Sequence, residues 1–253
     1  MFPRKIRLCN AFGIPVYLDF SLIILLLLFA TSGDSFTAGI ACALVLAVSI
    51  VAHELGHALT ARAFGYGTRD ITLSLIGGCA SLIALPRKAW QEFLTAIAGP
   101  AVSFALGAAV YFTYPLQPLH DRWMHEVCSF AYSANLMLGI FNLLPGFPMD
   151  GGRVFRSLMR AFMSRTKATY IAMIVGRVFA VVIGLLGLHR IVNGGGWGFV
   201  TILIAWMIWR EGWREYQLAR LEESVRGDGC DWRARVSPPP YGGEDDEVEI
   251  RER

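Results

Sequence analysis

Long apolar stretches alternate with short charged segments along most of this chain. Residues 93–114 and 127–149 contain no Asp, Glu, Lys or Arg, and as a helix each would cross about 30 Å of hydrocarbon. The pattern predicts an all-α polytopic membrane protein with about six transmembrane helices. The six predicted spans are roughly Ile14–Thr31, Thr37–Phe64, Phe93–Tyr114, Val127–Leu144, Thr169–Leu188 and Gly194–Trp209.

The segment Ile71–Leu85, between the second and third predicted spans, is too short to cross a membrane twice. Two β-prone runs flank Gly77-Gly78, and such a pair of glycines suits the turn of a hairpin. We therefore expect a short membrane-associated β-hairpin, shielded from lipid by neighbouring helices. An irregular interfacial loop is the alternative.

The composition also indicates a membrane protein. Hydrophobic residues make up 55% of the chain and charged residues 17%, whereas a soluble domain is nearer a quarter charged. The five cysteines are scattered and form no CxxC pair, which argues against a disulfide framework or a thiolate metal site. We expect an integral protein of a bacterial or archaeal plasma membrane, with the lipid bilayer and no nucleic acid as partner.

Basic residues gather at the ends of alternate predicted spans. If the N-terminus is cytoplasmic, most Lys and Arg residues flank the cytoplasmic ends, and Arg122 and Arg190 are the exceptions. The positive-inside rule then places both termini in the cytoplasm, with the first span retained and not cleaved as a signal peptide. Residues 1–222 are predicted to form the membrane domain, with core motifs in 37–153. Residues 223–253, rich in Pro, Gly and acidic residues, are predicted to be a disordered cytoplasmic tail.

The motif HELGH, residues 53–57, lies near the end of the second predicted span. His53 and His57 are four residues apart, so on a helix they lie on one face, one turn apart. Two imidazoles in that arrangement can bind one tetrahedral Zn²⁺, and Glu54 can take a proton from water at the metal. Because His and Glu are disfavoured in an apolar helix, the motif favours a metal site over two histidines bonded to backbone or water.

A third ligand is needed, since a catalytic zinc usually has three protein ligands and an open position. Asp150, in the sequence FNLLPGFPMDGGR, is the best candidate. The Pro and Gly residues around it disfavour a continuous helix, so an unwound segment could aim the carboxylate inward. The alternative is that Asp150 caps a helix over Gly151–Met163. Asn142 is near enough in sequence to donate a hydrogen bond to a substrate carbonyl or oxyanion.

These motifs together resemble the site-2 protease family of intramembrane zinc metalloproteases. The resemblance rests on HELGH, on Asn142-Leu143-Leu144-Pro145 with Asp150-Gly151, and on Gly77-Gly78 and Ile97-Ala98-Gly99-Pro100 between them. There is no room for an inserted PDZ domain between the third and fourth predicted spans. The chain is therefore similar to the compact branch that contains the sporulation protease, although Asp19 stands where relatives often carry His.

The resemblance implies roles for individual residues. His53, His57 and Asp150 would be zinc ligands, Glu54 the catalytic base, and Asn142 an assisting residue. It also implies a transmembrane protein substrate, such as an anti-sigma or pro-sigma factor, that is cut to release a regulatory factor.

We therefore expect a zinc metalloendopeptidase acting on a transmembrane or membrane-associated protein. A helical substrate would have to unwind, and the predicted hairpin offers an edge to which an extended segment can add as a strand. An inactive zinc-binding scaffold and a metal transporter are the alternatives, although a transporter usually needs several ligand clusters. Arg177, inside the fifth predicted span, is expected either to snorkel to water or to pair with Asp70 or Glu92.

Overall fold

The computed structural model describes most of the 253-residue chain, namely residues 5–20, 22–23, 27, 36–74, 77–83, 86, 88–114, 122–194 and 198–227. The strands in these ranges are β1 (Lys5–Ala11), β2 (Ile14–Asp19), β3 (Thr68–Ser74) and β4 (Gly77–Leu82). The helices are α2 (Phe36–Ala63), α3 (Ala89–Thr113), α4 (Arg122–Asn142), α5 (Asp150–Met159), α6 (Arg165–Val192) and α7 (Gly198–Gly227).

The four strands form one mixed sheet in the order β1-β2-β3-β4. The two outer pairs are antiparallel, and the central pair β2–β3 is parallel, with Val16 opposite Ile71. Side chains alternate along β2, so that Ile14, Val16 and Leu18 are buried. They form one apolar cluster with Ile71 and other residues of β3 and α2. The sheet is therefore fixed against the helix that carries the HELGH motif.

The fold is mostly helical but not all-α, because a four-stranded sheet is present where only a hairpin was predicted, and the first predicted span, Ile14–Thr31, was wrong at its start. Its first six residues form β2, while most of the remaining residues lie outside the described part of the chain. The apolar residues of the strand run directly into the apolar segment that follows them. For this reason hydropathy alone could not separate a strand from a helix at this place.

The hairpin predicted at Ile71–Leu85 is confirmed, with a different turn. Strands β3 and β4 pair antiparallel, and Ser74 lies opposite Gly77. Gly77-Gly78, where the turn was expected, belongs to β4, and residues 75–76 lie outside the described residues. The alternative of an irregular loop was wrong.

Three of the described helices, α2, α3 and α6, are long and apolar enough to cross a membrane. They correspond to the second, third and fifth predicted spans. The fourth and sixth spans are helical, as α4 and α7, but do not meet this criterion. Helix α4 begins with Arg122 and carries Glu126 in its second turn, and α7 is charged from Arg210 onward. The chain is an integral membrane protein with three candidate membrane helices in its described part.

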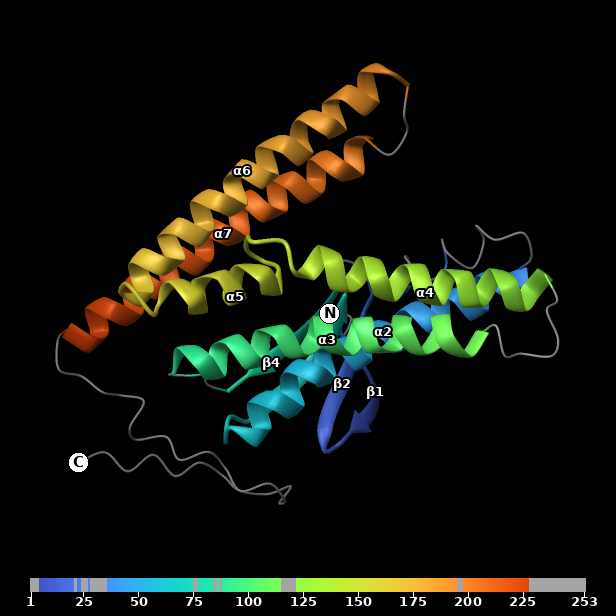
Figure 1. The fold of residues 1–253 in the computed structure, drawn as a ribbon, viewed down its shortest axis with the longest axis horizontal. Coiled ribbons are helices and arrows are strands. Elements are labelled where there is room, and N and C mark those ends of the chain that lie inside the picture. The colour runs from blue at the N-terminus through green and yellow to red at the C-terminus, as the bar shows by residue number, and fades with distance from the viewer. Residues whose placement is uncertain are drawn as a thin grey trace.

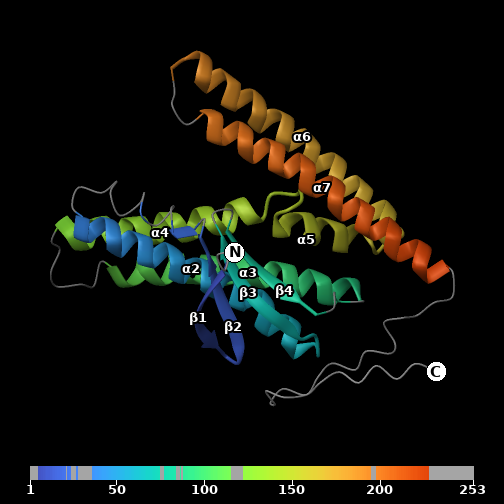
Figure 2. The ribbon, with the colours of Figure 1, turned by 180° about the vertical axis from the view of Figure 1, so that it is seen from behind.

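The helices form two groups. Helices α2, α3 and α4 pack together, whereas α6 and α7 form a long antiparallel hairpin that points away from them (Figure 1). Helix α5 lies between the groups and contacts both α3 and α6. Seen from behind, the sheet lies beside α2 and α3, on the side away from the α6–α7 hairpin (Figure 2). The short helix α5 is therefore the bridge between the two groups.

Helix α7 continues to Gly227, past residue 223 where the tail was predicted to begin. Residues 228–253 lie outside the described part, so the tail stays a prediction. The expected pairing of Arg177 with Asp70 or Glu92 was also wrong. Its guanidinium carbon lies 4.5 Å from the ring centre of Trp209 and 5.2 Å from that of Trp213. Helix α6 packs along α7, so Arg177 meets the aromatic face of α7, an attractive cation–π contact.

Candidate metal centre

The two histidines of HELGH face each other on one side of α2. His53 and His57 are 2% and 6% exposed, and their Nε2 atoms lie 3.2 Å apart. The rings meet edge to face. The four-residue spacing thus brings both Nε2 atoms to one point, as the sequence predicts.

The carboxylate of Asp150 lies at the same point. Its Oδ2 atom is 3.1 Å from Nε2 of His53 and 3.0 Å from Nε2 of His57. Asp150 is the first residue of α5, and the helix is capped by Met149 without a side-chain hydrogen bond. The alternative role of Asp150 as an N-cap was therefore wrong.

The segment between α4 and α5 is not helical, as predicted. Its backbone makes tight turns, with the N–H of Gly146 donating to the carbonyl of Leu144 and that of Met149 to the carbonyl of Gly146. A Cβ atom at Gly151 would overlap the carbonyl oxygens of Leu143 and Leu144. Only glycine therefore lets α5 begin so close to the end of α4, with Asp150 aimed at α2.

Helix α3 orients both imidazoles from the other side. Nδ1 of His57 lies 2.7 Å from the carbonyl oxygen of Thr95, which can only accept, so Nδ1–H donates and Nε2 keeps its lone pair. Nδ1 of His53 lies 2.9 Å from the hydroxyl of Ser103. Gly99 lies between these two residues on α3, and a Cβ atom there would overlap both rings. Such partners fix the tautomer and the direction of metal-binding histidines.

The three facing atoms fit a metal ion. All of them lie within 4.8 Å of one another in a buried group. Zinc bonds of about 2.0–2.1 Å in a tetrahedron place ligand atoms roughly 3.3–3.4 Å apart, close to the three separations found here. The group thus offers two imidazole nitrogens and one carboxylate oxygen.

Glu54 lies beside this group and against the sheet. It is 8% exposed, and a Cβ atom at Gly78 of β4 would overlap its carboxyl group. Strand β4 is the last strand of the sheet order. The carboxyl group is therefore held between the candidate metal ligands of α2 and an outer strand.

Asn142, the predicted assisting residue, is the last residue of α4 and is half-buried. Its side-chain amide donates to the carbonyl of Leu138, one turn back, at 3.0 Å. Its role stays a prediction, because this bond must open before the amide can reach a substrate.

Sequence reasoning found the four residues with distinctive chemistry and missed those that hold them. Thr95 acts through its backbone carbonyl, and Ser103 is an ordinary residue of an apolar helix. The resemblance marked Gly78 and Gly99 without giving either a role. One signal could have found them. Thr95, Gly99 and Ser103 are four residues apart in the third predicted span, so on a helix they share one face.

Comparison with known proteins agrees with this geometry. The model of peptidase family M50 matches residues 41–120 and 117–183, a region that contains the histidines, Asp150 and most of α6. The chain belongs to peptidase family M50. The predicted family resemblance is thereby confirmed.

Individual relatives give the same result. A protein of Synechocystis sp., provisionally named a zinc metalloprotease, is 36% identical over 241 residues, which is 88% of this chain and 62% of the relative. A zinc metalloprotease of Methanocaldococcus jannaschii is 35% identical over 73% of this chain and 54% of its own length. The chain thus spans a little over half of the length of these M50 relatives.

A solved structure also matches. The site-2 protease from Methanocaldococcus jannaschii superposes with a TM-score of 0.63 and 30% identity, over 84% of this chain and 95% of that one. The fold is therefore that of a site-2 protease of family M50, and zinc is the metal that the names of the relatives give.

Proposed function

We propose that this chain is an intramembrane zinc endopeptidase that cleaves a peptide bond in or beside a membrane-spanning segment of another protein. The observation that carries the proposal is a buried group in which Asp150 of α5 meets His53 and His57 of α2, a helix of membrane-spanning length. Ionisable groups buried among membrane helices are costly and mark functional sites. Membership of family M50 supports the same reaction class.

Each residue has a distinct part in this mechanism. Zinc, when bound by His53, His57 and Asp150, would act as a Lewis acid towards water and towards the substrate carbonyl. Glu54 would accept the proton of the attacking water and return it to the leaving amine. Asn142 would donate a hydrogen bond to the oxyanion after leaving Leu138.

The free edge of β4 supports strand addition as the mode of substrate binding. Among the described residues, β4 pairs only with β3, so its other side can accept an extended segment. Because Gly78 lies against Glu54, a segment on this edge would run past the proposed base. A helix hides its carbonyls in hydrogen bonds, and strand addition would expose the bond that is cut.

The substrate class and the topology follow from weaker support. The family resemblance and the buried site favour a membrane-anchored substrate, such as an anti-sigma or pro-sigma factor, cut to release a regulator. We keep six spans and cytoplasmic termini in a bacterial or archaeal plasma membrane, because the basic residues favour them. The composition of residues 228–253 supports a cytoplasmic tail that follows a membrane domain ending with α7.

The decisive experiment compares membrane proteomes of cells carrying wild-type protein or Glu54→Gln. Glu54→Gln should keep bound zinc but cut about a thousandfold more slowly, as expected from loss of a general base. A fragment should therefore appear only with wild type and with Glu223→Gln, a control at an exposed position of α7.

A fragment that persists with Glu54→Gln would contradict the protease assignment. Unchanged cell function with that variant would favour the scaffold alternative. Metal uptake into vesicles that disappears with His53→Ala would favour the transporter.

A further inference from the structure

We propose that Glu92 and Arg156 are positioning residues of the metal centre. Their buried ion pair would hold α5, and with it Asp150, at a fixed place on the helix that orients both histidines. The inference rests on the proposed zinc site. It concerns two residues that would act on the ligand Asp150 without touching the metal themselves.

Glu92 belongs to the same buried stripe of α3 as the partners of the histidines. Glu92, Thr95, Gly99 and Ser103 follow one another at intervals of three or four residues and are all buried. Residues with this spacing lie on one face of a helix. One face of α3 therefore holds both imidazoles and presents a carboxylate one turn further along.

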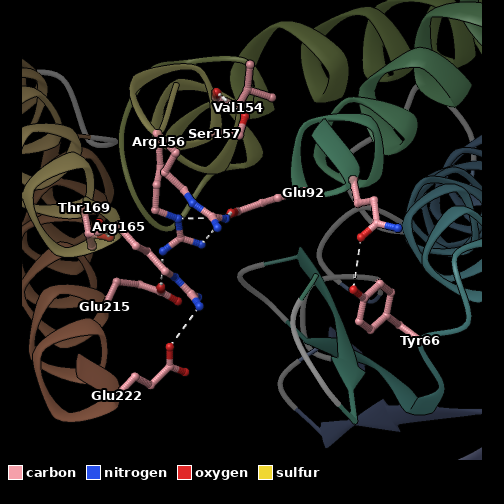
Figure 3. Close-up of polar contacts among 11 residues, drawn as sticks. Tyr66, Glu92, Val154, Arg156, Ser157, Arg165, Thr169, Glu215 and Glu222 are labelled. Atoms are coloured by element: carbon pink, nitrogen blue, oxygen red, sulfur yellow. Dashed lines mark hydrogen bonds and ion pairs between the residues drawn. The ribbon is translucent and has the colours of Figure 1, made fainter. Parts of the chain in front are cut away.

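Arg156 of α5 forms an ion pair with the carboxylate of Glu92. It is 1% exposed; its Nε donates to Oε1 of Glu92 at 2.7 Å, and its Nη2 lies 2.6 Å from the same oxygen (Figure 3). Its guanidinium carbon also lies 5.0 Å from the ring centre of Phe147, in the segment that leads into Asp150. Arg156 thus contacts α3 and the approach to the ligand together, about 9 Å along α5 from Asp150.

Further ion pairs extend this cluster towards the α6–α7 hairpin. Arg160 bonds to the second oxygen of Glu92 at 2.5 Å, and Glu215 of α7 accepts from Arg156 at 3.1 Å. Arg165 and Glu222 join α6 to α7 at 2.9 Å. The side chain of Glu92 is 6% exposed, against 23% and 26% for Glu215 and Glu222. The contact between α3 and α5 is thus the buried centre of the ion-pair cluster, and the carboxylates of α7 lie at its more solvent-exposed edge.

A purely structural role is the rival explanation. The backbone packing of Gly151 and Gly152 could fix Asp150 alone, and the ion pair would then only add stability. The two explanations differ in one measurable respect. If the pair positions Asp150, its loss changes metal affinity and geometry in protein that is still folded; if the pair is only structural, its loss changes the unfolding temperature alone.

The test uses the purified full chain in detergent. Zinc affinity is measured by competition with a chelator, and the geometry is measured from the absorption bands of bound Co²⁺. For Glu92→Gln and Arg156→Lys we expect zinc affinity to fall about tenfold, the lower end for loss of a group that supports metal ligands, with shifted Co²⁺ bands. Glu222→Gln, the matched control in the same cluster, should bind both metals as the wild type does.

Wild-type affinity and Co²⁺ bands in folded Glu92→Gln and Arg156→Lys would overturn the inference, whatever their unfolding temperatures. Should Glu92→Gln fail to fold, Glu92→Asp, which keeps the charge and shortens the reach, takes its place beside Arg156→Lys under the same criterion. Absence of metal binding by wild-type protein would be a different result, because it would refute the proposed zinc site itself.

Discussion

Helices α2 and α6 are both 28 residues long and both apolar enough to cross a membrane, yet they bury different side chains. Besides small and apolar residues, helix α2 buries the polar side chains of Ser49, His53, Glu54 and His57. Helix α6 buries mainly small residues, among them Ala172, Gly176 and Ala180 at intervals of four. Small residues at this spacing let helices approach closely. Two helices of equal length, both apolar enough to cross a membrane, thus differ in role: α2 carries the candidate metal ligands, and α6 serves packing.

The polar side chains of α2 are tolerated because other helices supply partners. Asn135 of α4 donates to the hydroxyl of Ser49, and α3 provides Thr95 and Ser103 to the histidines. Buried polar groups cost free energy unless they are hydrogen-bonded. Helix α6 instead contacts its neighbours through close backbone packing at glycines, since Gly176 lies against Gly146 and Gly187 against Gly198. The two helices should therefore fail in different ways.

The largest effect is expected at Gly99, where α3 meets the histidines of α2. Gly99→Ala would place a Cβ atom in overlap with Nε2 of His57 and 2.8 Å from Nε2 of His53. Displacing the two rings should weaken zinc binding about a hundredfold, the equivalent of about 3 kcal/mol. Gly107→Ala is the matched control on the same buried face, because its Cβ atom would meet Asn135 at an ordinary 3.7 Å. Equal zinc affinity of the two variants, measured by chelator competition, would contradict the site geometry.

A smaller effect of another kind is expected in the α6–α7 hairpin. A Cβ atom at Gly187 would lie 2.9 Å from the carbonyl oxygen of Gly198, whereas one at Gly184 would meet Ala205 at 3.6 Å. Gly187→Ala should therefore be less stable than Gly184→Ala by about 1–3 kcal/mol. Both replacements gain the same helix propensity, so the difference isolates packing. Unfolding in detergent measures it; zinc affinity should stay unchanged, and a loss in either folded variant would show that the two helices are not separable.

The smallest effect is expected from Ser103→Ala, which removes the hydroxyl beside Nδ1 of His53. The imidazole loses its orienting partner, and zinc affinity should fall about tenfold, or about 1.4 kcal/mol. Ser224→Ala, at an exposed position of α7, serves as control. Identical zinc titrations for wild type and Ser103→Ala would mean that packing of the ring, and not this hydrogen bond, sets its direction.

Much of the geometry of the candidate metal centre could be predicted because its determinants are local. The interval between His53 and His57 depends only on helix geometry, and the Pro and Gly residues before Asp150 predict the break that frees its carboxylate. Gly78, Ser103 and Arg156 could not be assigned, since their roles arise from contacts with residues distant in sequence. Glu92 and Arg156, for example, are 64 positions apart.

The fold was predicted where apolar segments are long and isolated, as in α2, α3 and α6. It failed at the N-terminus, because β2 is defined by its pairing with β1 and with β3, and β3 is distant in sequence. The partner of Arg177 was predicted wrongly for a similar reason, because its contact with Trp209 depends on the register of α6 against α7. Hydropathy indicates whether a segment lies in an apolar environment, but it does not indicate which other segment packs against it.

The parallel pairing of β2 with β3 also sets an order for biosynthesis. Val16 of β2 pairs with Ile71 of β3, and β3 follows α2 in the chain. During synthesis, β1 and β2 therefore lack β3 as a partner until α2 has left the ribosome. Gly78, which covers Glu54, is made later still, and Asp150 much later. A growing chain therefore contains its two histidines before Gly78 and Asp150 have been made, so the candidate metal centre is complete only after the start of α5 has been translated.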